Sequence, residues 1–330
     1  MRDFWHKLTN YEYWPTWLFY LPVYLCWPVF SWRAGSVFFF TMVNPGIKGG
    51  GSFGESKADI LQKLPSETIP QTRFIKSQAL LPTDLDFPVV AKPDVGERGT
   101  QVKIIHDQIE LSAYQCELGQ SFIIQDYLNG DFEAGVFVYR DPKQNKIIVS
   151  SITQKEFLTI QGDGKKTIGQ LVDQTPRSRF QWKRIKDKFD ENKILELGEV
   201  LILEKIGNHC KGTKFIDRND LKTIELEKYF ENLFQKLPDL FYGRFDLKAD
   251  SIEKFKRAET IKFMEFNGAF SEPGHIYDPK HSLISAWSDL LSHWWVMAKI
   301  AGNNKKNGIN PLTPKELWIQ FGDYRRTLQS

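Results

Sequence analysis

Two short runs in the C-terminal third constrain the fold most: GRFDLKA at 243–249 and IKFMEFN at 261–267. Both alternate apolar and polar residues around a charged connection, which predicts two antiparallel strands. Successive side chains of a strand point to opposite faces. The polar residues are therefore expected to share one face: Arg244, Asp246, Glu265 and Asn267. The apolar residues are expected to face the core: Phe245, Leu247, Met264 and Phe266.

The polar face of this hairpin suits a divalent cation. Carboxylate and amide oxygens without His or Cys favour Mg²⁺, which proteins hold with a few carboxylates plus substrate phosphates. A Pro273-Gly274 turn and aromatic residues follow directly, which favours a binding site over an ordinary surface hairpin. The alternative is a hairpin with one solvated face.

Residues 87–105 predict a strand, a glycine-containing loop and a second strand. The spacing matches neither a P-loop nor a dinucleotide fingerprint. Gly96 and Gly99 would let the backbone approach a polyanion, and Lys92 would supply a charge for phosphate oxygens. The alternative for Lys92 is a lysine whose stem lies along apolar surface while its amine reaches water.

Residues 122–140 predict a linker between two strands. The first apolar run ends in the linker residues Gln125, Asp126, Tyr127 and Leu128. Such a linker can present backbone groups to an adenine edge, while Glu133 in the second strand can accept hydrogen bonds from ribose hydroxyls. The alternative is a simple hairpin, because Asn129-Gly130 is a strong hairpin signal. The strand after it carries Lys155, a second candidate for phosphate.

In this order the motifs resemble the ATP-grasp superfamily, specifically its D-alanine–D-alanine-ligase-like carboxylate–amine ligases, across roughly residues 55–279. The resemblance implies an α+β fold in which two lobes grip ATP. It implies a catalytic domain at 55–330 with lobes at about 55–128 and 129–330, preceded by a hydrophobic segment at 1–54.

The resemblance also implies roles for individual residues. The residues implied to contact the nucleotide are Lys92, Lys155, Glu133 and residues 125–128. Ser56-Lys57 is a looser match to a further motif of the family. The implied ligands of two Mg²⁺ ions are Asp246, Glu265 and Asn267. Arg244 would steady an acyl phosphate or its transition state, with Lys155 beside it.

Three departures from the family separate this chain from the dipeptide ligases. Gln125-Asp126 replaces an acidic and a basic residue, and two extra residues separate Asn267 from Pro273-Gly274. The usual N-terminal α/β domain is missing. D-alanine is therefore not implied as a substrate.

The N-terminal segment is unusual. Residues 13–32 carry no formal charge and include nine aromatic residues, but Pro15, Pro22 and Pro28 interrupt them. Proline disfavours a spanning helix, and Trp and Tyr favour the membrane interface. We expect a Pro-broken segment in the interface; a wall packed on the catalytic lobes and a full span are the alternatives. No small-residue cleavage site follows, so a signal peptide fits poorly.

The next segments give four local expectations. Residues 36–43 predict a strand, and the glycine-rich residues 46–54 predict a flexible tether in preference to a lid. Ser56 predicts a helix start running through Leu64, and Thr167 a helix N-cap. A long helix from residue 281 is expected to end at Gly302.

Four residues near turns are candidate substrate contacts: His209, Ser271, His275 and Tyr277. A structural role for the histidines is the alternative.

Composition limits the partners. The net charge of +3 from 44 basic and 41 acidic residues gives no support for nucleic acid as a partner. Three cysteines without metal or redox spacing fit a reducing compartment.

The sequence thus predicts an ATP- and Mg²⁺-dependent ligase that joins a carboxylate to an amine through an acyl phosphate. It would act in the cytoplasm, on the inner face of the membrane if the N-terminal segment is interfacial, with an amphipathic substrate. A kinase that phosphorylates a small molecule and a non-catalytic nucleotide-binding protein at the membrane are the alternatives.

Overall fold

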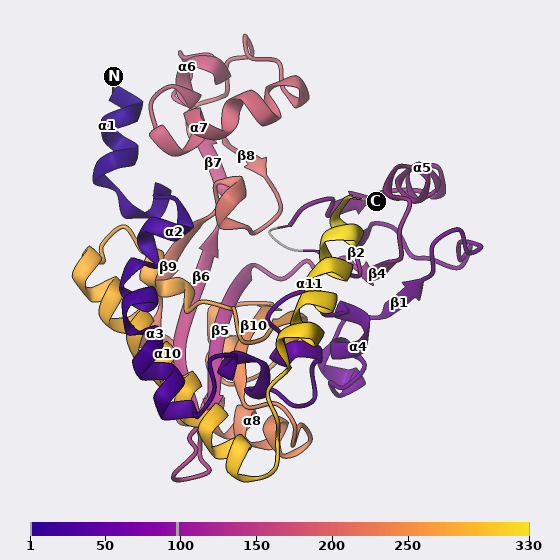
Figure 1. Ribbon diagram of the computed structural model, residues 1–330. Coiled ribbons are helices and arrows are strands. Elements are labelled where there is room, and N and C mark those ends of the chain that lie inside the picture. Colours follow the sequence, from indigo (N-terminus) through magenta and orange to yellow (C-terminus); the bar gives the residue numbers. More distant parts are fainter. Residues whose placement is uncertain (1, 97–98, 330) are drawn as a thin grey trace.

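The computed structural model describes residues 2–96 and 99–329 and has the expected α+β character (Figure 1). One antiparallel sheet has the order β1-β4-β2-β3. Its strands are β1 (Thr72–Ile75), β2 (Val89–Pro93), β3 (Lys103–Ile105) and β4 (Phe122–Asp126). α5 (Gln108–Leu118) packs on this sheet through Leu111, Tyr114 and Leu118, and Asp107 caps the helix. α4 (Lys57–Leu61) precedes the sheet and ends three residues before the predicted Leu64.

A second antiparallel sheet forms the centre of the molecule, with the order β11-β10-β5-β6-β9. Its strands are β5 (Phe132–Arg140), β6 (Ile147–Glu156), β9 (Lys214–Asp217), β10 (Tyr242–Ala249) and β11 (Lys262–Asn267). One face packs on the apolar side of α8 (Ile224–Gln235) and on α9 (Ile252–Lys256). β4 and β5 belong to different sheets, so residues 127–131 are a linker between sheets and the hairpin alternative is wrong.

A small sheet of β7 (Leu158–Gln161) and β8 (Val200–Glu204) carries α6 (Ile168–Val172) and α7 (Pro176–Ile185) above the central sheet (Figure 1). Thr167 caps α6 as predicted, in a capping box with Gln170. Short 3-10 helices connect many of the elements: Tyr11–Tyr13, Phe39–Met42, Lys48–Gly50, Ser66–Thr68, Lys186–Lys188, His209–Lys211, Asn219–Leu221 and Gly274–Tyr277.

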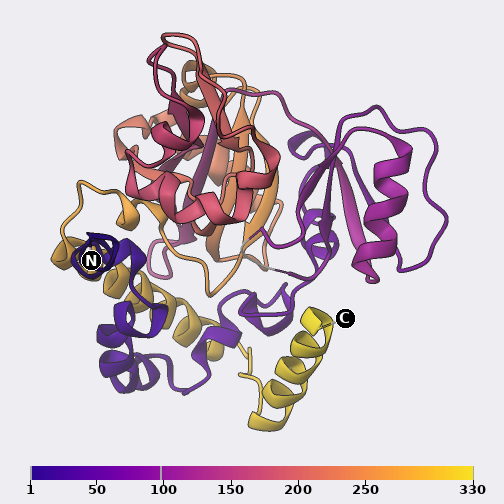
Figure 2. The same cartoon turned by 90° about the horizontal axis from the view of Figure 1, so that it is seen from above.

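The N-terminal helices are α1 (Arg2–Thr9), α2 (Thr16–Phe19) and α3 (Leu21–Ala34). α3 lies along α10 (Leu283–Lys306), which Figure 2 shows from above, and α11 (Pro314–Gln329) ends the described chain. The expected helix end at Gly302 is wrong, because α10 continues past it. A Cβ at Gly302 would lie 2.9 Å from the carbonyl oxygen of Arg33, so this glycine permits the close approach of α3.

The strand predicted for residues 36–43 is also wrong. Residues Phe39–Met42 form a buried 3-10 helix in the aromatic core between α3 and α10. Asn304 of α10 donates to the carbonyl oxygens of Met42 (2.9 Å) and Val43 (3.2 Å), which satisfies backbone groups that a neighbouring strand would otherwise take.

The glycine-rich loop is not a flexible tether, because it is built into the core. The fully buried Asn44 accepts from the backbone of Phe241 and Tyr242 and donates to the carbonyl oxygens of Gly50 and Tyr242. Gly50 in turn accepts from the backbone of Ala269 at 3.1 Å, directly after β11. The loop is therefore fastened to both ends of the β10–β11 hairpin.

The prolines break the N-terminal segment only in part: Pro15 lies at the interruption between the 3-10 helix Tyr11–Tyr13 and α2. Pro22 occupies the first turn of α3, where proline is tolerated, and α3 continues through Pro28. One side of α3 packs on the protein, as in the buried-wall alternative. Among the described residues no helix is both long and apolar enough to cross a bilayer.

An ion pair ties the N-terminal segment to α7. Glu12 is paired with Arg177 and lies 3.4 Å from Nε2 of His209. Burial opposes ionisation of Glu12, but hydrogen bonding to His209 and the charge of Arg177 outweigh it and lower the pKa of the carboxyl group to about 2. A depressed carboxyl pKa stabilises the folded state above the unfolded pKa, and this stabilisation is lost as the pH falls towards the folded value.

We therefore expect Glu12→Gln to lower the free energy of unfolding by roughly 2 kcal/mol at pH 7. The difference from the wild type should shrink between pH 4.5 and about 2, as the wild-type carboxyl is protonated. Urea unfolding at a series of pH values measures this, and a difference that does not depend on pH would contradict the ion-pair explanation.

Candidate active site

The β10–β11 hairpin brings the four predicted polar residues together. Arg244 lies opposite Asn267 and Asp246 opposite Glu265. The register then shifts, so that Leu247 lies opposite Phe263. Phe263 is fully buried, and the prediction that Met264 faces the core is wrong because the bulge inserts this residue.

Asp246 is the centre of the polar face. Arg244 donates to both of its carboxylate oxygens, at 2.9 and 3.3 Å, and Asn267 donates at 3.4 Å. Lys155 Nζ lies 3.5 Å from Oδ2 of Asp246. Burial would raise the pKa of Asp246, but the charges of Arg244 and Lys155 hold it below its ordinary value. Asp246 is therefore a buried, ionised carboxylate.

Lys155 joins three neighbouring strands. It projects from β6 between Asp246 on β10 and Glu133 on β5, with 3.4 Å between Nζ and Oε1 of Glu133. Burial would lower the pKa of Lys155, yet the two carboxylates raise it above its ordinary value. Gly135, opposite Asp246, leaves room here, because a Cβ there would lie 3.1 Å from Cδ of Arg244 and 3.2 Å from Oδ1 of Asp246.

Lys92 reaches the same face from the four-stranded sheet. Its amine donates to the carbonyl oxygen of Met264 at 2.8 Å, so the bulge supplies its hydrogen-bond acceptor. Burial is the largest influence and lowers the pKa of Lys92 to about 8, although the nearby Glu265 opposes it. Lys57 lies 3.7 Å from Oε1 of Glu265 and also donates to the carbonyl oxygen of Gly96.

The start of α4 is fixed to the end of β2, which positions Lys57. Oδ1 of Asp94 accepts from the Ser56 hydroxyl (2.9 Å) and the Ala58 backbone (2.8 Å), and the Lys57 backbone donates to the Asp94 carbonyl at 3.1 Å. Two lysines from the first sheet region, Lys57 and Lys92, thus face the hairpin.

The predicted linker residues divide into two groups. Gln125 lies in the sheet and its side chain donates to Thr72 at 3.0 Å, while Asp126 is exposed. Tyr127 and Leu128 lie beside Lys248, which donates to the Leu128 carbonyl at 3.0 Å and lies 3.8 Å from Oε2 of Glu133. Tyr127 and Leu128 therefore adjoin Glu133, whereas Gln125 and Asp126 are the last residues of β4 and pair with β2.

Two glycine-containing loops meet beside this face. Gly207 approaches Glu133 so closely that a Cβ would lie 2.0 Å from its Oε1. Gly99 lies against Ile206 and Asn208, at 3.5 and 3.6 Å from the position of a Cβ. Gly99 therefore lies beside the loop that contacts Glu133, and the carbonyl oxygen of Gly96 accepts from Lys57. Residues 97 and 98 between them lie outside the described residues.

The four candidate substrate residues separate. His209 and Tyr277 have ring centroids 5.0 Å apart, and Tyr277 donates to Glu272 at 2.9 Å. The Ser271 hydroxyl donates to the Gly268 carbonyl at 2.5 Å. Both ring nitrogens of the buried His275 are engaged, with Ser151 at 2.7 Å and Asp289 at 3.2 Å, which is the arrangement of a structural histidine.

Glu272 and Tyr20 are residues that sequence reasoning missed. The Tyr20 hydroxyl donates to Glu272, whose backbone carbonyl accepts from Arg244 at 3.1 Å. Burial, strengthened by the Glu272 carboxylate, raises the pKa of Tyr20 well above its ordinary value. Tyr20 and Glu272 are 252 residues apart, so no local spacing signals the contact.

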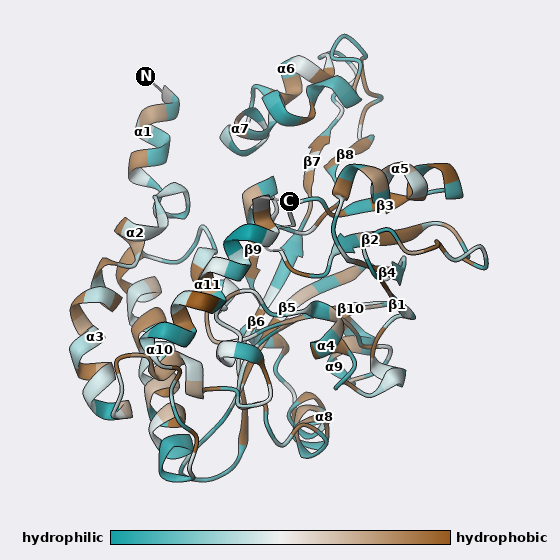
Figure 3. Ribbon diagram, turned by 45° about the vertical axis from the view of Figure 1, so that its right-hand side comes forward, coloured by the Kyte–Doolittle hydropathy of each residue, from teal (hydrophilic) through white to brown (hydrophobic). Residues whose placement is uncertain are grey.

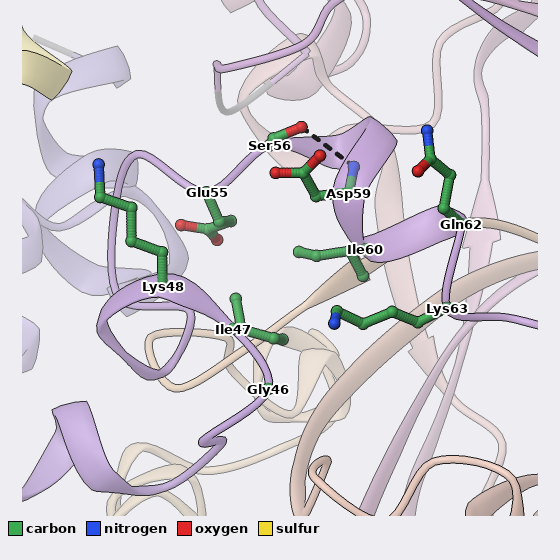
Figure 4. Close-up of a pocket in the computed structure, with 9 residues that line it drawn as sticks. All are labelled: Gly46, Ile47, Lys48, Glu55, Ser56, Asp59, Ile60, Gln62 and Lys63. Carbon is green, nitrogen blue, oxygen red and sulfur yellow. Dashed lines mark hydrogen bonds between the residues drawn. The ribbon is translucent and has the colours of Figure 1, made fainter.

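Two cavities border the glycine-rich loop, and of the residues predicted above only Ser56 lines either of them. A cavity of about 460 Å³ lies between this loop and α4; Figure 4 shows Lys48, Glu55, Ser56 and Asp59 around it. A second, of about 610 Å³, lies between the loop and α11. Their linings do not include the polar hairpin face, so we assign the candidate active site from the charged residues.

The donor chemistry of the hairpin fits a magnesium ion. In the described part of the chain no three His, Cys, Asp or Glu residues are grouped so that they could hold a metal. Asp246, Glu265 and Asn267 offer two carboxylates and one amide, all hard oxygen donors on neighbouring strands. Mg²⁺ usually keeps several waters and takes substrate phosphates as ligands, so this incomplete set suits it.

Comparison with known proteins gives matches among solved structures alone: no family model and no curated protein matches the sequence. The chain is similar to a D-alanine–D-alanine ligase from Bacillus anthracis complexed with ATP, with a TM-score of 0.41 and 16% identity over 81% of this chain and 67% of that one. A VanG D-Ala:D-Ser ligase from Enterococcus faecalis gives 0.38 and 15% over 72% of this chain and 61% of that one.

A bifunctional glutathione synthetase from Pasteurella multocida gives a TM-score of 0.39 and 16% identity over 72% of this chain. The chain spans about a third of that protein, 36% of its length. Similarity at this level fixes neither the substrates nor the reaction of this chain, and the interpretation rests on its own residues.

The bridging position of Lys155 can be tested by stability. We expect Lys155→Met to cost on the order of 2–4 kcal/mol of unfolding free energy, because it leaves two buried carboxylates short of a counter-charge. Adding Glu133→Gln should restore part of the loss. Urea unfolding measures both.

Lys254→Met is the matched control. Lys254 forms an exposed ion pair with Asp250 at 2.6 Å, and we expect its loss to cost less than about 1 kcal/mol. Equal losses for the two lysines, or strictly additive effects of Lys155→Met and Glu133→Gln, would refute the buried bridge.

Proposed function

We propose that this protein is an ATP-grasp ligase that joins a carboxylate to an amine at the polar face of the central sheet. The observation that supports it best is the excess of cations around that face. Five cationic side chains surround it: Lys57, Lys92, Lys155, Arg244 and Lys248. Four carboxylates lie among them: Glu133, Asp246, Glu265 and Glu272. A site with more buried positive than negative charge suits a polyanion such as a nucleotide triphosphate.

In this proposal the nucleotide lies between the two sheets, whose lobes divide at about residue 128. Lys92 and Lys155 contact phosphate oxygens, and Gly96 and Gly99 permit the loop after β2 to approach them. Residues 125–128 adjoin the adenine and Glu133 the ribose. Of these contacts, those of Tyr127, Leu128 and Glu133 have the best support, since these residues lie around Lys248.

Asp246, Glu265 and Asn267 would hold Mg²⁺, two ions by analogy with the family. The bound metal would neutralise phosphate charge and fix the orientation of the triphosphate. Around it Arg244 and the two lysines lie where they could stabilise negative charge on the transferred phosphoryl group.

The reaction would have two steps. A carboxylate oxygen attacks the γ-phosphorus, the bond to the β-phosphate oxygen breaks, and acyl phosphate and ADP form. An amine nitrogen then attacks the acyl carbon and loses its proton, the carbon–oxygen bond to the phosphate breaks, and inorganic phosphate leaves. Positioning and electrostatics provide most of the rate enhancement in such transfers. Tyr277, His209 and Ser271 are the proposed substrate contacts; His275 acts at most by supporting Ser151.

We place the reaction in the cytoplasm, where ATP is available. A membrane surface as a partner and an amphipathic compound as one substrate belong to the same proposal, since Tyr20 connects the aromatic N-terminal segment to Glu272 beside Arg244.

The test is magnesium-dependent ATP binding by calorimetry, followed by phosphate release with panels of acids and amines. We expect turnover to require an acid and an amine together. Turnover with one substrate alone would indicate a kinase, and ATP binding without turnover a non-catalytic protein. Asp246→Asn should lower turnover at least 100-fold and abolish the magnesium dependence of ATP binding.

Asp250→Asn is the control for Asp246→Asn, because Asp250 follows β10 directly but forms an exposed pair with Lys254. It should leave ATP binding and turnover unchanged. Tight ATP binding that is indifferent to both magnesium and Asp246→Asn would contradict the assigned metal face.

A second prediction concerns the contact between Gly207 and Glu133. We expect Gly207→Ala to displace the Glu133 carboxylate, because the new methyl group would lie 2.0 Å from it, and to weaken ATP binding about tenfold through the lost ribose contact. Gly322→Ala in α11 is the control, since nothing lies within 4 Å of its Cβ position. Unchanged ATP affinity in Gly207→Ala would remove Glu133 from the nucleotide site.

A further inference from the structure

The outer side of the N-terminal helices carries a concentration of exposed apolar side chains. Six of them, from α1, α2 and α3, define what we call the aromatic face: Trp5, Trp17, Tyr24, Leu25, Val29 and Trp32. The exposed fractions of Trp17, Leu25 and Trp32 are 65, 72 and 81%. Figure 3 colours nearly all of α3 pale or brown, so this helix has no strongly hydrophilic side.

The orientation of this face is fixed by packing. The opposite side of α3 buries Val23, Phe30 and Ala34 against α10, and Gly302 lets the two backbones come close. Phe30 stacks on Trp294 with centroids 6.4 Å apart. Leu25, Val29 and Trp32 therefore point outward because the other face of the helix is already occupied.

The charges of the segment are unevenly distributed. Its two acidic residues before Glu55, Asp3 and Glu12, are paired with Arg179 and Arg177 of α7, and Lys7 of α1 lies over the ring of Phe180 in α7. Arg33 belongs to the last turn of α3, and Lys305 donates to the Gly35 carbonyl directly after this helix. The end of the aromatic face that carries Trp32 is thus bordered by two basic residues, while the acidic residues are neutralised on the side of α7.

We propose that the aromatic face docks on the surface of an anionic lipid bilayer. Trp and Tyr rings favour the headgroup region, where one part of the ring system is apolar and another is wet. Basic residues at the border complement anionic headgroups. The helices lie in the interface and do not cross it, consistent with the short, Pro-containing α3.

Docking would place the candidate active site near the lipid surface. Tyr20 lies between α2 and α3, and its hydroxyl bonds Glu272, whose backbone binds Arg244. A substrate with a lipid tail would therefore have a short path to the site; this last step rests on the proposed ligase function, whereas docking itself does not.

Cosedimentation of the full chain with vesicles tests the docking. We expect binding to vesicles of phosphatidylglycerol and phosphatidylcholine, little binding to phosphatidylcholine alone, and release as the salt concentration rises. The double variant Leu25→Ser/Trp32→Ser should lose binding at least tenfold. A wild-type chain that stays in the supernatant with anionic vesicles overturns the proposal.

The control is Leu197→Ser/Trp318→Ser, which removes the same two residue types at exposures of 83 and 77% away from the aromatic face. It should bind vesicles like the wild type, and both double variants should keep the wild-type urea midpoint. Equal loss in both would indicate general hydrophobic adsorption and overturn the proposal.

Light scattering of the free protein tests whether a second copy of the chain, instead of a lipid surface, covers the aromatic face. A wild-type dimer that Leu25→Ser/Trp32→Ser converts to a monomer would make a second copy of the chain the occupant and overturn lipid docking. Calorimetry of ATP binding to the same variant, expected to match the wild type, keeps a failure of docking distinct from a failure of the ligase assignment.

Discussion

The ion bridge of Lys155 to Glu133 and Asp246 is the interaction on which the site depends. A lysine that is 8% exposed needs counter-charges, and its two carboxylates come from the adjacent strand β5 and from β10, the strand beyond it. The order β10-β5-β6 thus brings the lysine and both carboxylates together on one face of the sheet. Two glycines make the arrangement sterically possible: Gly135 beneath Arg244 and Asp246, and Gly207 over Glu133.

The N-terminal segment supports this site from the side. Asn44 fixes the glycine-rich loop to the start of β10 with four hydrogen bonds, and the loop in turn pairs with the residues after β11. Tyr20, between α2 and α3, then donates its hydroxyl hydrogen bond to Glu272. The segment is therefore structural on its inner side, and its outer side is left free to serve as a contact surface. One stretch of chain connects the backbone of the hairpin to the aromatic face.

Local periodicity predicted the parts of the fold that local forces determine. The hairpin of Arg244 and Asn267, the strand of Lys155 and the cap at Thr167 follow from alternation and capping chemistry, and all three are confirmed. The bulge at Met264 could not be predicted, because KFMEFN reads equally well with either register. Residues 36–43 form no strand, because an uninterrupted apolar run fits any buried element and Asn304 of a distant helix satisfies its backbone. The contact of Tyr20 with Glu272 depends wholly on tertiary structure.

The charge balance explains why such a site would couple ligand binding to stability. Five cations against four carboxylates leave positive charge in a partly buried region, and burial, with a smaller contribution from the charges of Lys57 and Lys155, lowers the pKa of Lys92 to about 8. A polyanion placed there would remove the repulsion among the lysines, and it would stabilise their charged forms and the contact between the two sheets at once. Since anything that binds the folded state alone stabilises it, the free energy lost in gathering these cations is recovered when the ligand binds. The same lysines that make the free site unfavourable are therefore those that would give a triphosphate its affinity.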